Sequence, residues 1–178
     1  GIILIGLTIS ASSATEIALK YFPYISAFVI IIFFIGLFLA NLFKVDRSLG
    51  ILIASGTAIC GATAMAAISP LIKSKPKDLF AALTIIFVFN AIAIGIFPLI
   101  GVTTGMNFES FGAWSSMAVH DTASVIGTAI AFGGDAVETA TILKLSRTIW
   151  LIPLIIILGI FYQDRSKPKL PIFILLFI

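Results

Sequence analysis

The chain contains little charge and almost no cysteine or histidine. Asp, Glu, Lys and Arg make up only 11% of its 178 residues, whereas about a quarter of a typical soluble domain is charged. The single cysteine, Cys60, excludes an internal disulfide framework, and with the single histidine, His120, it cannot fill a tetrahedral metal site. The net charge of +3 is spread over short loops, which argues against nucleic-acid binding. We therefore expect no cofactor, no metal and no nucleic-acid partner.

Apolar residues, in contrast, are abundant. They make up 60% of the chain and fall in blocks near the roughly 20 residues that a spanning helix needs. The blocks run continuously instead of alternating in short strands, which favours helices over a barrel. Clean spans cover 23–43 and 79–100, another helix is expected over 136–162, and the apolar block 1–19 should end in a surface turn at 10–16. The sequence predicts an all-α, polytopic transmembrane helical bundle.

Both ends of the chain predict an internal fragment of a longer protein. The chain starts at Gly1 without a methionine and stops at Ile178 inside an apolar run too short to cross a bilayer. The first apolar block lacks the basic region and the cleavage site of a signal peptide. We expect residues 1–178 to form a single transmembrane domain.

Two stretches, 54–67 and 115–129, are crowded with Gly, Ala, Ser and Thr. Small residues allow close helix packing, and hydroxyls can satisfy the backbone of a broken helix. The stretches are therefore either tightly packed interior helices or discontinuous or re-entrant segments.

Loop charges bear on this choice through the positive-inside rule. If both small-residue stretches return to the side from which they entered, the basic loops at 44–47, 73–77 and 164–169 all fall on one side. The acidic loops then fall opposite, and they contain Glu109, Asp135 and Glu138. The charge pattern favours re-entry.

The dipeptide His120-Asp121 lies inside the apolar stretch 113–132. Ionisable groups at membrane depth are costly and tend to line a pathway. Imidazole titrates near neutral pH, and burial makes a carboxyl easier to protonate, so the pair is a candidate for proton coupling. The alternative is that Asp121 only caps the half-helix that follows it. The two roles are compatible.

A polar lining is expected around this pair. In a continuous helix, Ser124 and Thr128 would follow His120 at one-turn intervals on a shared face. Hydroxyls and free N–H groups at a half-helix N-terminus suit an oxyanion, and the first small-residue stretch would supply the opposite wall. The alternative is ordinary small-residue packing. The candidate substrate-site residues are Thr57, Cys60, Gly61, Thr63, Ser124 and Thr128.

Three further polar residues lie in the expected helices. Lys144 and Arg147, spaced i, i+3, either extend to lipid headgroups or line a vestibule that attracts an anion. Asn90 is expected to make an interhelical hydrogen bond. An intramembrane enzyme would need Cys60 as nucleophile and His120 as base, and because the sequence shows nothing that would activate the thiol, we expect no enzyme.

Three motifs carry a resemblance to a known family. They are Gly56-Thr-Ala-Ile-Cys-Gly-Ala-Thr-Ala64, Val119-His-Asp-Thr-Ala-Ser-Val-Ile-Gly127 and Ala140-Thr-Ile-Leu-Lys-Leu-Ser-Arg147. In these motifs, their order and their spacing, the chain resembles the YeiH-like sulfate exporter family, a family of uncharacterised membrane proteins. The resemblance implies a relation to the cation/proton antiporter and bile-acid transporter group, which is built from inverted repeats with crossed broken helices. In that fold a broken helix crosses the membrane, so crossing remains an alternative to re-entry.

The sequence is thus interpreted as part of an inverted-repeat secondary transporter in a prokaryotic inner membrane. It would export sulfate or another small anion, and protons would drive this transport. Membrane lipid would surround it. The sequence does not fix the oligomeric state, and a homo-oligomer is one possibility. Two alternatives remain. The first is a cation/proton antiporter in which Asp121 alternately binds a proton and a metal ion. The second is a structural or assembly subunit without transport activity.

Overall fold

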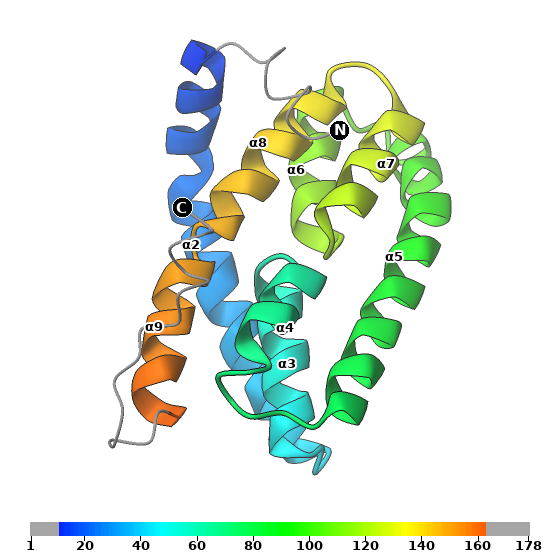
Figure 1. Cartoon of the computed structure of the whole chain (residues 1–178). Coiled ribbons are helices and arrows are strands. Elements are labelled where there is room, and N and C mark those ends of the chain that lie inside the picture. The colour runs from blue at the N-terminus through cyan, green and yellow to red at the C-terminus, as the bar shows by residue number, and fades with distance from the viewer. Residues whose placement is uncertain (1–10, 163–178) are drawn as a thin grey trace.

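The computed structural model describes residues 11–162, with side chains from Glu16 onward. The start of the first apolar block and the basic loop 164–169 lie outside the described residues. The described chain is helical apart from short connections, so the expected all-α class is confirmed (Figure 1). Its helices are α2 (Ala11–Leu42), α3 (Arg47–Ala58), α4 (Ala62–Ile68), α5 (Pro76–Thr103), α6 (Phe108–Ala118), α7 (Thr122–Phe132), α8 (Ala136–Thr148) and α9 (Leu151–Tyr162).

Three helical segments are long and apolar enough to cross a membrane. They are Glu16–Leu42 in α2, Pro76–Thr103 in α5, and Ala136–Tyr162, which α8 and α9 share. α5 exposes large apolar side chains such as Phe87, whereas its buried face carries the polar Asn90. A helix of a soluble protein normally places such residues the other way round. The architecture is that of a membrane helical bundle.

The first small-residue stretch folds as a helical hairpin, with residues 59–61 at its tip between α3 and α4 (Figure 1). The two helices lie side by side, because a Cβ atom at Gly56 in α3 would lie 2.5 Å from Cε of Met65 in α4. Gly61 has a φ of 64°, a conformation that glycine adopts without steric cost. Gly61 therefore permits the backbone conformation at which the helix is interrupted between α3 and α4.

The second small-residue stretch forms a matching hairpin from α6 and α7. The ring of Phe111 stacks on that of Phe132, with centroids 3.8 Å apart, so the start of α6 lies beside the end of α7. The two hairpins extend from opposite ends of the bundle and their tips meet (Figure 1). A Cβ atom at Gly61 would lie 3.3 Å from both the carbonyl carbon of His120 and the backbone nitrogen of Asp121.

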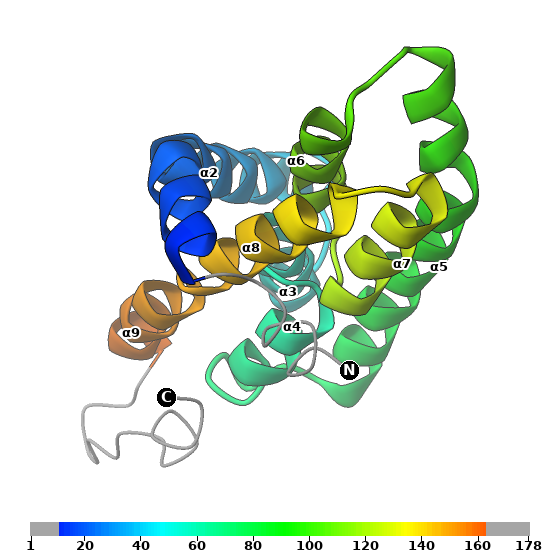
Figure 2. The same ribbon diagram turned by 90° about the horizontal axis from the view of Figure 1, so that it is seen from above.

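A long helix precedes each hairpin. α2 leads into α3 and α4, and α5, which runs in the opposite direction, leads into α6 and α7 (Figure 1). α8 then passes between the two sets and packs against α2, α6 and α7 (Figure 2). This position gives side chains of α8 access to both hairpin tips.

Basic residues gather at one end of the bundle, here called the basic end. The α2–α3 turn and the α4–α5 connection both lie there, and the guanidinium carbon of Arg47 is 5.5 Å from the ring centroid of Tyr162 at the end of α9. The basic residues at this end are Lys44, Arg47, Lys73, Lys75 and Lys77.

The opposite end carries acidic residues in its connections. Lys20 near the start of α2 pairs with Glu109 at the start of α6, with Nζ and Oε1 2.9 Å apart. Asp135 precedes α8 and Glu138 lies in its first turn. Among the described residues, the basic and acidic loops therefore lie at opposite ends, as the loop-charge argument expected.

The surface turn expected at 10–16 is wrong for the described part of that range, because α2 is already helical from Ala11. Small polar residues there gave the expectation, but they include no glycine or proline that would end a helix. Pro23, expected at the start of a span, lies inside α2. Polarity alone did not locate the end of this helix.

We expect Gly61→Ala to lower stability by about 1–2 kcal/mol, because a Cβ atom is strained at positive φ and would press on the opposite hairpin tip. Gly95→Ala in α5 is the control, since a Cβ atom there has no neighbour within 4 Å. Thermal unfolding of the purified protein in detergent measures both variants. Equal melting temperatures for Gly61→Ala and wild type would contradict the tight contact between the tips.

Candidate functional site

The two hairpin tips meet halfway along the long helices. Asn90 lies at the centre of the span Pro76–Thr103, and Arg147 lies near the centre of Ala136–Tyr162. Phe28, near the middle of α2, has its ring centroid 5.1 Å from the guanidinium carbon of Arg147. Polar groups of the tips are thus concentrated at the depth where three apolar helices have their midpoints.

Arg147 joins the two hairpins through backbone carbonyls. Its Nε donates to the carbonyl of Ala58 at 2.7 Å, and an Nη2 hydrogen bond reaches the carbonyl of Thr57, both at the end of α3. Its Nη1 donates to the carbonyls of Ser116 and Met117 at the end of α6, at 3.0 and 2.9 Å. The last carbonyls of a helix have no intrahelical partner. One guanidinium therefore satisfies carbonyls at the C-terminal ends of two half-helices.

Lys144, one turn earlier in α8, also binds a backbone carbonyl at a hairpin tip. Its Nζ donates to the carbonyl of Val119 at 2.9 Å. The exposed fractions of Lys144 and Arg147 are 0% and 1%. The structure thus places both cations inside the bundle against the hairpin tips, at neither a headgroup interface nor an open vestibule.

Asp121 caps α7. Its Oδ2 accepts from the backbone nitrogens of Ala123 and Ser124 at 3.1 and 3.2 Å and from Oγ of Ser124 at 3.4 Å. The capping role expected from the sequence is confirmed. Asp121 is half-buried and lies two residues beyond Val119, whose carbonyl binds Lys144, so its carboxyl group also belongs to the polar group at the tips.

His120 and Asn90 join α5 to the second tip. Oδ1 of Asn90 accepts from the backbone nitrogen of His120 at 3.1 Å and lies 3.2 Å from its Nδ1. The interhelical hydrogen bond expected for Asn90 is therefore present. His120 precedes α7 instead of sharing a helical face with Ser124.

The amide of Asn90 leaves one donor unused. Because a backbone N–H can only donate, Oδ1 must face His120, and this fixes the direction of Nδ2. The side chain of Asn90 is 2% exposed, and its Nδ2 has no partner among the described residues. A buried donor without a partner costs about 1–3 kcal/mol. The sequence predicted only an interhelical hydrogen bond for Asn90, and the unsatisfied amide now makes this residue a candidate for binding a substrate.

The expected lining residues are placed around the tips in different ways. Thr57 is at the end of α3, and Cys60 and Gly61 are buried tip residues. Thr63 is half-buried in α4, whereas Thr128 is fully buried and its Oγ1 donates to the carbonyl of Ser124. Most of these residues therefore border the junction of the tips, and Thr128 lies further along α7.

Within the described residues, no group of three or more His, Cys, Asp or Glu gathers as a metal site would require.

Basic side chains outnumber carboxylates at the junction. Lys144 and Arg147 both donate to carbonyls of the tips, and Asp121 supplies one carboxyl group. The meeting helix ends contribute partial charges of about one half each, negative from α3 and α6 and positive from α4 and α7, which cancel to first order. The basic side chains, and above all the guanidinium of Arg147, therefore decide the sign of the charge at the junction.

Together, the apolar spans and the buried polar junction define a polytopic membrane protein with a charged centre. The chain belongs to the family described as conserved hypothetical protein 698, whose model matches residues 1–178. No solved structure matches the chain.

Curated relatives agree with this class. A UPF0324 membrane protein of Shewanella oneidensis is 40% identical over 174 residues, which cover 97% of this chain and 55% of that protein. One of Bacteroides thetaiotaomicron is 43% identical over 146 residues, covering 81% of this chain and 44% of the relative. The chain spans about half the length of these relatives. It is a bacterial membrane protein with several candidate spans.

We expect Arg147→Lys to lower stability by at least about 2 kcal/mol although it keeps the charge, because one ammonium cannot satisfy carbonyls on both hairpins and each unsatisfied carbonyl costs about 1–3 kcal/mol. Arg47→Lys is the control, since Arg47 is exposed. Denaturant unfolding in detergent compares the two. A loss no larger than that of the control would show that charge alone suffices at position 147.

Proposed function

We propose that this chain is part of a secondary transporter, not an enzyme, and that it moves a small oxyanion such as sulfate across the bacterial inner membrane. The observation that carries the proposal is the buried, positively charged junction at the middle of the long helices. Secondary transporters bind substrate near the bilayer midplane, where helices are interrupted. Groups that stabilise an anion there are a cationic surplus and unused hydrogen-bond donors.

Several side chains at the junction could donate hydrogen bonds to the proposed anion. The amide of Asn90 has a free Nδ2, and the lining residues Thr57 and Thr63 carry hydroxyls; the hydroxyl of Ser124 already donates to Asp121. Lys144 and Arg147 would hold the tips and supply the positive field without touching the anion. Asp121, and His120 beside it, would carry the coupling proton, because protonation of the carboxylate raises the positive charge at the site and strengthens anion binding.

The hairpins would be re-entrant in this proposal. Each would enter and leave at one side of the membrane, and the two sets of a long helix followed by a hairpin would form an inverted repeat. The lysines and arginines of the basic end would place that end in the cytoplasm by the positive-inside rule. Both tips would then reach the midplane from opposite sides, and the substrate site would lie at the interface of the two repeats.

A cation/proton antiporter is the second candidate. The half-buried carboxylate of Asp121 at the junction favours it, since such a group could bind a proton and a metal ion in turn. The two buried cations oppose it, because they repel a metal ion at the same place.

Uptake of labelled sulfate into proteoliposomes containing the complete protein tests the proposal. A pH gradient should drive uptake, and Asp121→Asn should abolish the gradient-dependent part. Asn90→Ala should raise KM about tenfold, since a hydrogen bond to a charged group contributes about 1.5–3 kcal/mol. Glu109→Gln is the control, because Glu109 is an exposed acid at the end of the bundle opposite the basic end. Absence of sulfate uptake together with sodium/proton exchange would replace the proposal by the antiporter.

Cysteine labelling tests re-entry. In a Cys60→Ala background, cysteines at Lys44 and Lys75 flank the first hairpin, and those at Thr104 and Asp135 flank the second. With a membrane-impermeant thiol reagent, we expect positions 44 and 75 to react from one side, and positions 104 and 135 from the other. Labelling of 44 and 75 from opposite sides would mean that the broken helices cross the membrane.

A further inference from the structure

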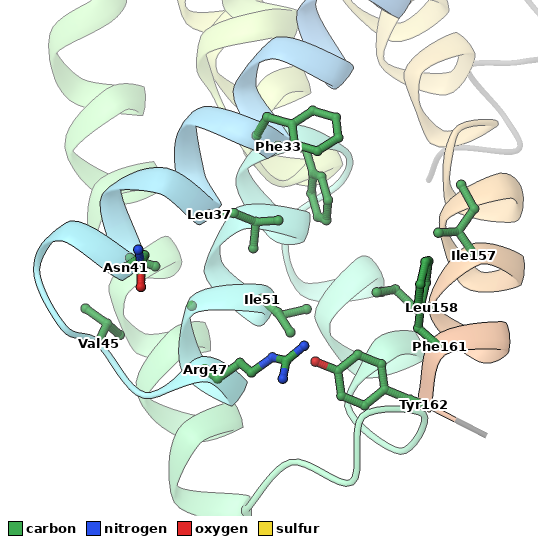
Figure 3. A pocket seen from close by; sticks show the side chains of 13 residues that line it. Phe33, Leu37, Asn41, Val45, Arg47, Ile51, Ile157, Leu158, Phe161 and Tyr162 are labelled. Atoms are coloured by element: carbon green, nitrogen blue, oxygen red, sulfur yellow. The ribbon is translucent and has the colours of Figure 1, made fainter. Parts of the chain in front are cut away.

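A separate apolar groove opens at the basic end, between α2 and α9. Its volume is about 790 Å³. Phe33 and Leu37 of α2 line one wall, and Ile157 and Leu158 of α9 line the other (Figure 3). The α2–α3 turn closes its lower end with Arg47. The groove is thus apolar along its length and cationic at one end.

The polar groups at that end are available for a ligand. Arg47 is exposed and makes no hydrogen bond or ion pair within the described part of the chain; its guanidinium faces the ring of Tyr162 at 5.5 Å. The hydroxyl of Tyr162 is buried and has no partner among the described residues. Figure 3 shows this hydroxyl directed toward the guanidinium of Arg47. The unused N–H groups of the guanidinium and the hydroxyl beside it can both donate hydrogen bonds to the oxygens of a phosphate group.

The length of the groove fits one membrane leaflet. From Phe33 to Asn41, both of which line it, the helical rise is about 12 Å. Half of the roughly 30 Å hydrocarbon core is about 15 Å. An acyl chain lying along Leu37 toward Phe33 would therefore remain within the leaflet whose headgroups lie at the level of Arg47.

We propose that this groove binds an anionic phospholipid, with the phosphate at Arg47 and Tyr162 and an acyl chain along the apolar walls. Basic pockets between membrane helices are known to recognise anionic headgroups. Lys44, exposed in the same turn, adds positive charge near the headgroup. The site requires only that the bundle lies in a membrane, so it stands independently of the transport proposal.

Native mass spectrometry of the purified protein, titrated with phosphatidylglycerol or phosphatidylcholine, tests the site. We expect several-fold more phosphatidylglycerol than phosphatidylcholine to be retained. Arg47→Gln should remove this difference, and Tyr162→Phe should reduce it. Lys75→Gln, which removes an equal charge at the same end but outside the groove, should leave it unchanged.

A second variant tests the contribution of the apolar walls to lipid binding separately from that of the headgroup contact. Leu37→Trp should fill the groove and lower retention of both lipids while Arg47 remains in place. Melting temperatures in lipid-free detergent verify that each variant is folded. Equal retention of the two lipids by wild type, or an equal effect of Lys75→Gln and Arg47→Gln, would overturn the proposal. So would a stable dimer that retains no lipid, since the groove would then be covered by a second copy.

Discussion

The backbone carbonyls at the ends of α3 and α6 impose the constraint on which the rest of the structure depends. In water such groups would be hydrated, but at the middle of an apolar bundle they need partners within the protein. Arg147 supplies them on both hairpins at once, and Lys144 adds a further contact at Val119. α8 must therefore lie between the hairpins, and the two tips are held against each other at Gly61 and Asp121.

This solution has an electrostatic consequence. The two buried basic side chains are bound by carbonyl dipoles, which carry only partial charges. A protein that only needed to pack two hairpins could have used neutral donors at lower desolvation cost. The buried basic side chains, beside the unused amide of Asn90, are the feature on which the proposal of anion binding rests.

Several elements could be predicted from particular residues. The apolar spans follow from composition, the cap of α7 from Asp121, and a break within 54–67 was one of the two alternatives that its small residues left open. The placement of basic and acidic loops at opposite ends followed from counting loop charges. The start of α2 was not predictable, because small polar residues near its beginning are compatible with both a turn and a helix.

The sequence by itself determined the membrane class, the two stretches in which helices could be interrupted and the presence of a few ionisable residues in apolar segments. Only the tertiary structure decided what those residues face. Arg147 and Thr57 are 90 positions apart, and Asn90 and His120 are 30 apart. No helical period relates such distant positions, since α8 reaches the end of α3, and α5 reaches the tip between α6 and α7, only in the folded bundle. Packing, not local pattern, turned Arg147 from a candidate surface cation into the link between the two hairpins.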